Sequence, residues 1–278
     1  MKSIKSLKSE FRRISHDNLP YHWLESVLLF ILNKNKSFLI TDEDYVLSDE
    51  EWQRFSDGLN KLHLGIPPAY IIGKQGFFGH EFVVNEHTLI PRADTEILVE
   101  MVLAFTNERQ LDGGKILDLG TGSGCIAISL AKALPHFNVT AVDYSTQALE
   151  VAKQNANLLG VNNCCFVHSN WYDDIFDKFD VIVSNPPYIA KNDEHLIHLN
   201  AEPMTALVAD NDGLSDIECI INGGKHHLNH QGLLAIEHGH LQGGAVQTLF
   251  IKAGFTQVKT IKDYGGNDRA TLGVFLGI

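Results

Sequence analysis

Apolar residues in the first quarter of the chain recur every three or four positions, which is the spacing of one face of an α-helix. Ser48 and Glu51 have the spacing of a capping box, which marks the start of a helix. We therefore predict a helical domain over residues 1–74, bounded by the prolines of residues 65–73 (GIPPAYIIG). The apolar positions are Ile4, Leu7, Phe11 and Ile14; Leu24, Val27, Leu28, Ile31 and Leu32; and Trp52, Phe55, Leu59 and Leu62.

Residues 77–90 alternate between apolar and polar positions, as a strand does when one of its faces is buried. Phe82 and Val84 precede Asn85-Glu86-His87, and Leu89 follows. We expect a β-hairpin that turns at Asn85-Glu86-His87 and links two domains through residues 75–91.

Beyond residue 91, short apolar runs alternate with helical segments, the pattern of an α/β domain with a doubly wound, mostly parallel sheet. This domain is expected to occupy residues 92–278, and Ser145 is the expected N-cap of one of its helices. Strands are predicted at 115–119, 139–142, 164–167, 179–184, 233–236, 256–261 and 270–276, and helices at 125–133, 145–159, 214–228 and 241–253.

Composition narrows the functions open to such a protein. The chain of 278 residues has 34 Asp and Glu against 22 Lys and Arg, and its net charge of −12 disfavours the broad contact with phosphates that duplex nucleic acid requires. No segment approaches the roughly 20 apolar residues that cross a membrane. The four cysteines and 14 histidines show no metal-ligand spacing, so we expect a reduced, cytosolic protein without a metal site.

The first thirteen residues are basic, with Lys2, Lys5, Lys8, Arg12 and Arg13. A transit peptide carries similar charge, but the helical spacing of the apolar residues among them favours the first amphipathic helix of the fold. In an acidic protein, these side chains are the local basic surface on which a partner protein would dock.

A glycine-rich loop, Asp118-Leu-Gly-Thr-Gly-Ser-Gly124, follows a predicted strand and opens a helix. Glycines let a ligand approach the backbone closely, and Asp143, at the end of the next strand, is placed to bind the hydroxyls of a ribose. The alternative is a turn that merely packs strand on helix. The spacing is neither a P-loop nor the GxGxxG of dinucleotide folds; it resembles motif I of the S-adenosylmethionine-dependent methyltransferases. The cofactor-binding candidates are Gly120, Thr121, Gly122, Ser123, Gly124 and Asp143.

The turn Asn185-Pro186-Pro187-Tyr188 follows the fourth strand, where ligands bind in open α/β sheets. The Asn185 side-chain carbonyl and the Pro186 backbone carbonyl can both accept hydrogen bonds from one NH2 group. They would direct its lone pair at a methyl carbon and favour the positive charge that develops on nitrogen. Consecutive prolines fix the turn, and Tyr188 offers a face for a planar group. The alternative is a strand-ending turn without chemistry.

Together with these motifs, several segments resemble the HemK-type family, the glutamine-N5 methyltransferases of peptide-chain release factors. The resemblance implies a Rossmann-like sheet with an antiparallel last strand, S-adenosylmethionine as cofactor, and the glutamine of the Gly-Gly-Gln motif of class 1 release factors as substrate. The segments are GIPPAYIIG, FFGHEF, Leu89 to Glu96, Glu202-Pro203, Glu237-His238-Gly239, and Asp263-Tyr-Gly with Asp268-Arg269.

The same resemblance assigns roles to single residues. Asn185, Pro186 and Tyr188 would be catalytic, residues 185–188 would bind the glutamine, and Asn185 and Trp171 would also contact the cofactor, Trp171 beside the adenine. The sequence departs from the family at Ala93, usually a proline, and at Asn170, usually an acid.

Other functions stay open at this point. An adenine or cytosine amino-methyltransferase acting on nucleic acid would use the same turn, but the acidic charge disfavours it, and a non-catalytic binding module would have no need of the turn. We expect a monomeric, cytoplasmic enzyme that binds neither membrane nor nucleic acid. Arg92, Asp94 and Glu96 either line the cleft or begin a helix, and Glu237 and His238 are not included in the site.

Overall fold

The computed structural model describes residues 2–17 and 19–277, the side chains of His195 and His198 excepted. The chain forms two compact units. The first contains the chain up to Lys74 together with Ile197–Ala201, and the second contains Gln75–Leu196 and the chain from Glu202 onward. Among the residues described, no helix is both long and apolar enough to cross a membrane.

The first unit is helical, as predicted, and its helices bury the faces that the apolar spacing indicates. Ile4, Leu7 and Phe11 are buried, and the Phe11 ring lies 5.5 Å from the Phe55 ring. The Ser48–Glu51 capping box is confirmed, with both of its hydrogen bonds formed. The helices are α1 (Ile4–Ile14), α2 (Tyr21–Leu32), α3 (Phe38–Thr41), α4 (Asp49–His63) and α5 (Pro68–Ile72).

The two prolines expected to end the helical region instead begin its last helix. Pro67 is the N-cap of α5 and Pro68 its first residue. A proline costs little there, because the first backbone N–H groups of a helix have no partner within it. The helix ends at Gly73, whose φ of 76° is the left-handed conformation that glycine adopts without strain.

The predicted hairpin exists, but its turn lies at Phe78-Gly79 and not at Asn85-Glu86-His87. Strands β1 (Lys74–Phe77) and β2 (His80–Val83) are joined by these two residues, with φ of 45° and 74°. Two consecutive left-handed residues suit the twist of a two-residue hairpin loop. Asn85 forms a separate turn, in which its Oδ1 accepts from the His87 N–H at 3.0 Å.

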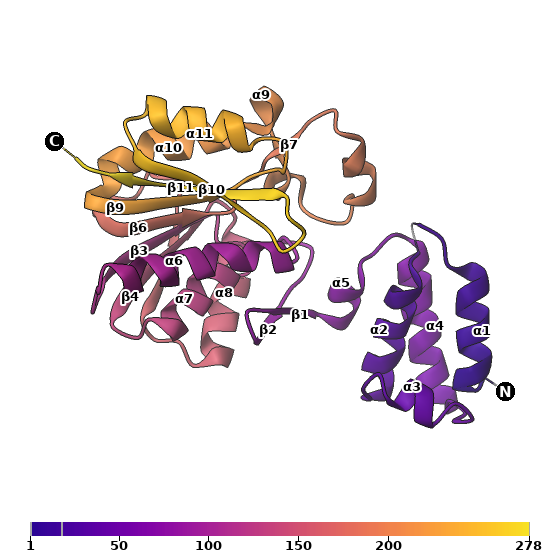
Figure 1. Ribbon diagram of the computed structural model, residues 1–278. Coiled ribbons are helices and arrows are strands. Elements are labelled where there is room, and N and C mark those ends of the chain that lie inside the picture. Colours follow the sequence, from indigo (N-terminus) through magenta and orange to yellow (C-terminus); the bar gives the residue numbers. More distant parts are fainter. Residues whose placement is uncertain (1, 18, 278) are drawn as a thin grey trace. The chain divides into compact units, whose positions relative to one another are not determined.

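The second unit is built on a seven-stranded sheet in the order β10-β11-β9-β6-β3-β4-β5 (Figure 1). Its pairs from β9 through to β5 are parallel, and β11 runs antiparallel to both of its neighbours. The predicted fold class, with its antiparallel last strand, is therefore confirmed. The strands are β3 (Gly114–Leu119), β4 (Phe137–Asp143), β5 (Cys164–His168), β6 (Phe179–Ser184), β9 (Leu228–Glu237), β10 (Thr256–Lys262) and β11 (Asp268–Phe275).

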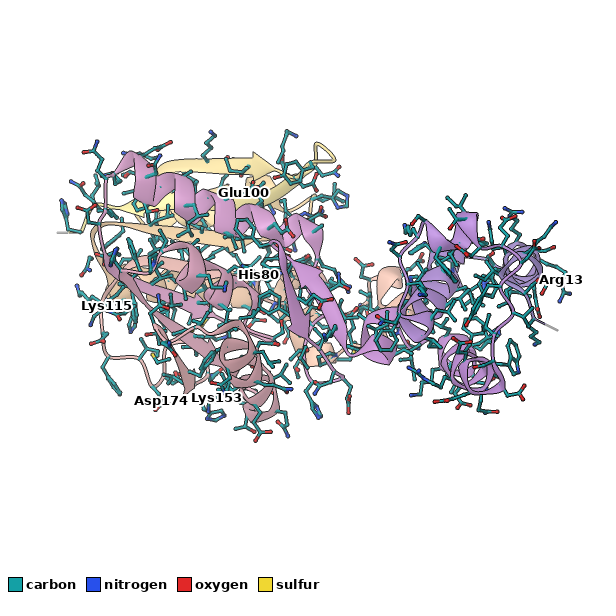
Figure 2. All side chains as sticks on the ribbon, turned by 90° about the horizontal axis from the view of Figure 1, so that it is seen from below. Arg13, His80, Glu100, Lys115, Lys153 and Asp174 are labelled. Atoms are coloured by element: carbon teal, nitrogen blue, oxygen red, sulfur yellow. The ribbon has the colours of Figure 1, made fainter. Side chains whose placement is uncertain are left out.

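Helices cover both faces of this sheet, and each face has its own apolar core. Helices α6 (Glu96–Glu108), α7 (Cys125–Ala133) and α8 (Thr146–Leu159) pack on one face, and α10 (Ser215–His227) and α11 (Gly243–Lys252) on the other (Figure 1). Ser145 caps α8 as predicted, its Oγ accepting from the Ala148 N–H. Charged side chains such as Glu100 of α6 and Lys153 of α8 lie at the surface (Figure 2).

Strand β9 begins at Leu228, five residues before the predicted strand at 233–236. The polar run Asn229 to Gln231 does not have the apolar pattern of a buried strand, so the sequence does not indicate this start. The pairing with β6 is irregular over the same residues: Phe179 pairs with Leu228, but Val181 pairs with Leu233. Between β6 and β9 lie elements that the pattern did not predict. They are β7 (Ile189–Ala190), η2 (Glu194–His198), η3 (Met204–Ala206), β8 (Val208–Ala209) and α9 (Asp210–Gly213).

The order of the strands determines where a ligand binds. From β3 the chain continues outward through β4 to β5, and β6 then lies on the other side of β3, followed by β9. Such a reversal leaves a crevice at the carboxyl ends of the central strands. The glycine loop after β3 and the Asn-Pro-Pro-Tyr turn after β6 meet at this edge, because β3 and β6 are parallel neighbours.

Candidate active site

A cavity of about 400 Å³ opens at the carboxyl ends of β3, β4 and β6, within the second unit. It brings together residues from the two motifs, which lie more than sixty positions apart in the sequence. Of the residues predicted for the site, Gly120, Thr121, Gly122, Ser123, Asp143, Trp171, Asn185 and Pro187 line it.

The backbone of the glycine loop is hydrogen-bonded to Asp143, at the end of β4. Asp143 accepts from the backbone N–H groups of Gly122 and Ser145, both at 2.8 Å. Gly122 has a φ of 55°, and nothing lies within 4 Å of the position a Cβ would take. This open backbone fits a ligand that approaches closely.

Gly124 does not line the cavity and instead lies where two helices pack together. A Cβ there would lie 2.7 Å from Ile128 Cδ1 and 3.1 Å from Ala152 Cβ, so glycine lets α7 and α8 approach. Its φ of 82° also requires glycine.

Asp118 is buried beneath the loop. The Thr121 hydroxyl donates to its Oδ2 at 2.7 Å, and its Oδ1 has no hydrogen-bond partner among the described residues. Burial raises the pKa of Asp118 to about 7, against the opposing hydrogen bonds.

Trp171 lies across the loop, where a Cβ on Gly120 would contact its ring at 3.5 Å. Its backbone φ of 49° is left-handed, which is unusual for a large side chain, and its ring interacts with Asp216. The neighbouring Asn170 is exposed and donates to Asp173 at 3.3 Å.

Asn185 lines the cavity with one of its amide atoms already bonded. Its Nδ2 donates to Thr95 Oγ1 at 3.2 Å, whereas its Oδ1 is buried and has no partner among the described residues. The Ser184 hydroxyl donates to Leu119 O at 2.7 Å, which ties the end of β6 to the end of β3. The turn therefore offers a buried acceptor beside the glycine loop.

Tyr188 and Pro186 differ from the other residues of the turn, because they do not line the cavity. The Tyr188 hydroxyl donates to Glu237 Oε1 at 3.2 Å, and the ring packs against the core under α10 and α11. The predicted use of the Tyr188 face for a planar substrate group does not match this position; the side chain supports the turn from behind.

Residues 92–96 connect the cavity to three other parts of the second unit. Arg92 pairs with the buried Glu202, Asp94 pairs with Arg269 at 3.3 Å, and Glu96 accepts from the Phe78 N–H at 2.7 Å. Arg92 and Thr95 line the cavity, but Asp94 and Glu96 do not.

Sequence reasoning missed Thr95, Glu202 and Glu237. Glu237, at the carboxyl end of β9, occupies a position that the topology marks as functional, whereas nothing in the local sequence indicates that Glu202 meets Arg92.

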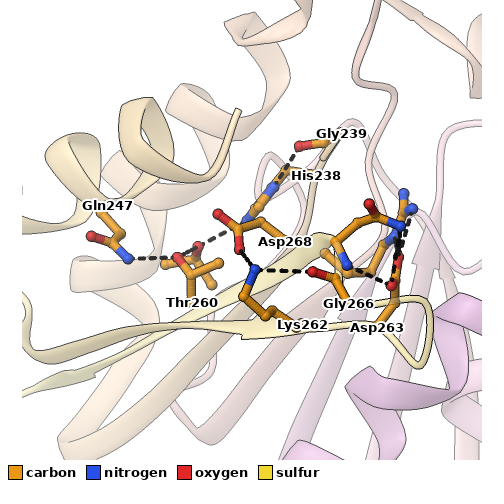
Figure 3. A network of polar contacts seen from close by, with 11 residues as sticks. His238, Gly239, Gln247, Thr260, Lys262, Asp263, Gly266 and Asp268 are labelled. Carbon is orange, nitrogen blue, oxygen red and sulfur yellow. Dashed lines mark hydrogen bonds and ion pairs between the residues drawn. The ribbon is translucent and has the colours of Figure 1, made fainter. Parts of the chain in front are cut away.

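His238, next to Glu237, belongs to a separate structural network (Figure 3). Its Nδ1 is 2.9 Å from Gly239 O, which can only accept, so Nδ1 carries the proton and Nε2 accepts from Thr271. Thr271 in turn accepts from Thr260, which accepts from Gln247 at 2.7 Å. His238 is buried, and its pKa is lowered by burial. It is therefore a neutral residue that fixes β9 to β11.

The fold and the site define a class of protein. A doubly wound sheet with an antiparallel last strand, a glycine cradle after β3 and a carboxylate at the end of β4 are the features of an S-adenosylmethionine-dependent methyltransferase. The cavity fits this cofactor: the open backbone of Gly122 leaves room for it, and the Ser123 hydroxyl is buried without a partner among the described residues. In the described part of the chain, no three His, Cys, Asp or Glu side chains are grouped to hold a metal ion.

Comparison with known proteins also indicates a methyltransferase and identifies the family to which the chain is related. Residues 93–206 match the family model of the methyltransferase small domain, and residues 11–73 match that of the PrmC N-terminal domain. The fold is similar to that of a methyltransferase from Pyrococcus furiosus, with a TM-score of 0.54 and 21% identity over 83% of this chain and 100% of that one. A 16S rRNA methyltransferase of T. Thermophilus, solved with AdoMet and guanosine, has a TM-score of 0.53 and 16% identity over 73% of this chain and 49% of that one.

The chain belongs to the release factor glutamine methyltransferases. It is 40% identical over 271 residues to the release factor glutamine methyltransferase of Buchnera aphidicola subsp. Acyrthosiphon pisum, covering 97% of each chain. It is 44% identical over 251 residues to that of Aliivibrio fischeri, covering 89% of this chain and 87% of the relative. The family resemblance stated from the sequence is thereby confirmed.

Proposed function

We propose that the protein transfers a methyl group from S-adenosylmethionine to the side-chain amide nitrogen (N5) of the glutamine in the Gly-Gly-Gln motif of class 1 release factors. The observation that carries this proposal is the buried, unpartnered Oδ1 of Asn185 in a turn that lines the cavity beside the glycine loop. A buried acceptor without a partner costs on the order of 1–3 kcal/mol. Its retention is explained if a substrate N–H donates to it.

The turn makes a poor nucleophile reactive by orientation. An amide nitrogen shares its lone pair with the carbonyl, so one conformation must be selected in which the lone pair meets the methyl carbon. Asn185 Oδ1 and the Pro186 carbonyl accept the two N–H groups of the substrate amide, and both acceptors favour the positive charge that develops on nitrogen. No base is required beforehand, because the nitrogen becomes acidic only once it carries that charge.

The remaining predicted residues are assigned to the cofactor, which supplies an electrophilic methyl group on a sulfonium centre when bound. The backbone of Gly120 to Gly122 would cradle it, Asp143 would bind the ribose hydroxyls, and Trp171 would lie beside the adenine. Asn170, exposed at the same cavity, would accept from the adenine amino group without an acid's charge.

The parts of the chain divide the work. We assign recognition of the release factor to residues 1–74, the link to residues 75–91, and transfer to residues 92–278. The enzyme is proposed to act as a monomer in the cytoplasm, with no direct contact with nucleic acid. The net charge of −12 supports the last point, because phosphate contacts need clustered cations.

Incubation of the purified protein with methyl-labelled S-adenosylmethionine and a class 1 release factor tests the proposal. Label is expected on the Gly-Gly-Gln peptide and is expected to be absent from a release factor whose glutamine is replaced by alanine. DNA and ribosomal RNA, assayed in parallel, are expected to remain unlabelled. Cofactor-bound protein that labels nucleic acid instead of the peptide would contradict the proposal.

A further inference from the structure

The orientation of the Asn185 amide decides whether the turn attracts or repels its substrate. An asparagine side chain presents an acceptor at one end and two donors at the other. With Nδ2 bonded to Thr95, the acceptor Oδ1 is the atom left for the substrate. If the amide turned over, its NH2 group would face the NH2 group of the substrate, and one of the two acceptors would be lost.

Thr95 is placed to prevent this reversal. It is buried where the 3-10 turn η1 (Ala93–Thr95) runs into α6, and its hydroxyl makes no capping hydrogen bond to the helix. It accepts from Asn185 instead. A hydroxyl that accepts in this way still has its own hydrogen to donate. Burial raises the pKa of Glu237, and an interaction with the Thr95 side chain opposes that shift, as a hydrogen bond donated to the carboxylate does.

Glu237 is a buried acceptor joined to the turn by a hydrogen bond. It is buried at the end of β9, and its Oε1 already accepts from the Tyr188 hydroxyl at 3.2 Å. Arg269 favours its charged form and Asp94 opposes it, while Arg269 and Asp94 are themselves paired at 3.3 Å. In its ionised form the Glu237 carboxylate only accepts, so it keeps the Thr95 hydrogen directed toward itself and the Thr95 lone pairs directed toward Asn185.

We propose that Thr95 and Glu237 are positioning residues that set the orientation of the Asn185 amide, so that Oδ1 and not Nδ2 meets the substrate nitrogen. The inference rests on the proposed function, in which Asn185 Oδ1 accepts from the glutamine amide. Neither residue takes part in the transfer itself. Through Tyr188, the same carboxylate also holds the far end of the turn.

Two substitutions at Thr95 separate the hydroxyl from the shape of the side chain. Thr95→Val keeps the shape and removes the hydrogen bonds, and we expect it to lower kcat for release factor methylation roughly 10- to 100-fold. Thr95→Ser keeps the hydroxyl and is expected to retain activity within about threefold. Thr106→Val is the matched control, because Thr106 is also buried and on α6, but its hydroxyl donates to Leu103 O of its own helix.

A double-mutant cycle with Asn185→Ala tests whether Thr95 acts through Asn185. Single-turnover methyl transfer should fall with Thr95→Val in the wild-type background and show little further fall in the Asn185→Ala background. Cofactor affinity, measured by calorimetry, should be unchanged by Thr95→Val in either background. Glu237→Gln, which offers one acceptor where the carboxylate offers two, is expected to give an intermediate loss.

The outcomes distinguish this inference from the function on which it rests. Absence of label with wild-type protein would contradict the proposed function. Normal labelling with wild type, loss with Asn185→Ala and full activity with Thr95→Val would overturn the positioning role alone. Equal losses from Thr95→Val in both backgrounds, or an equal loss from Thr106→Val, would show a general structural effect and would also overturn it.

Discussion

Two carboxyl groups that support the site from behind, Asp118 and Glu237, are fully buried, and burial raises the pKa of each to about 7. Each has one oxygen bonded and one without a hydrogen-bond partner among the described residues. Unfolded, the same groups ionise near their ordinary values, so between about pH 4 and pH 7 the folded protein holds protons that the unfolded chain has released. Stability therefore decreases as the pH rises through this range.

Asp118→Asn should remove its share of this dependence. The free energy of unfolding of the variant, relative to wild type, is expected to increase by up to about 1.4 kcal/mol for each pH unit between pH 5 and pH 7. Urea denaturation at pH 5, 6 and 7 measures it, with Asp174→Asn, on an exposed loop residue, as control (Figure 2). Parallel curves for Asp118→Asn and wild type would show that Asp118 does not carry the proton.

At the scale of elements, the segment after the Asn-Pro-Pro-Tyr turn is fastened to the start of α11. Gln242 donates to Tyr188 O and to Asp212 O, both at 3.0 Å, and accepts from the Gly239 N–H at 2.8 Å. Gly213 passes so close that a Cβ would lie 2.0 Å from Tyr188 O, and its φ is 81°. The position of the turn therefore depends on α9 and its one glycine.

Gly213→Ala should displace the turn. We expect a loss of about 2 kcal/mol in stability, from the strained backbone and the contact with Tyr188 O, and a fall in kcat of roughly 100-fold. Gly244→Ala is the control, because Gly244 is exposed in α11 and nothing lies within 4 Å of its Cβ position. Thermal unfolding and methylation rates measure the two effects; normal kinetics for Gly213→Ala would mean that the turn keeps its position without this glycine.

For the whole molecule, most of the basic N-terminal residues remain available to a partner. Lys8 is engaged by Glu43 at 2.6 Å and by Leu39 O, and Lys2 lies over the Trp52 ring. Lys5, Arg12 and Arg13 are exposed on α1, and Arg13 is seen at the surface of the helical unit (Figure 2). Because the protein as a whole has a net charge of −12, the attraction of this cationic surface for a partner extends over only a short distance.

Reversing the charge of this surface should weaken docking of the release factor. Arg12→Glu combined with Arg13→Glu is expected to raise the KM for the release factor about 3- to 10-fold at low salt and less at high salt, with kcat and cofactor affinity unchanged. Lys153→Glu, on the exposed side of α8, is the control. An equal KM for the double variant and wild type at low ionic strength would exclude α1 as the docking surface.

How much of this molecule was predictable depends on the range of each interaction. Helix caps and the apolar face of a helix depend on residues three or four positions apart. The caps at Ser48 and Ser145 and the buried face of α1 were therefore predicted correctly from the sequence. The predicted position of the hairpin turn was wrong because Asn85 is a strong turn former that makes a turn of its own. Phe78, which a sequence pattern does not mark as a turn residue, adopts a left-handed conformation before Gly79.

The candidate site shows the same limit. The meeting of the two motifs at the cavity could be predicted from the sequence, because each motif follows a predicted parallel strand and the carboxyl ends of parallel strands lie at the same edge of a sheet. The partners behind them do not follow: Thr95 and Asn185 are ninety residues apart, Arg92 and Glu202 one hundred and ten. Only the folded chain brings these side chains together, and a single sequence contains no local signal for such pairs.

The internal hydrogen bonds of the glycine loop bear on the thermodynamics of cofactor binding. Asp143 accepts from the Gly122 and Ser145 N–H groups, and Asp118 accepts from the Thr121 hydroxyl. A loop held by hydrogen bonds of the protein itself loses little conformational entropy when its ligand binds. The heat capacity change of binding should then reflect the apolar surface that the cofactor covers, with no contribution from a folding transition.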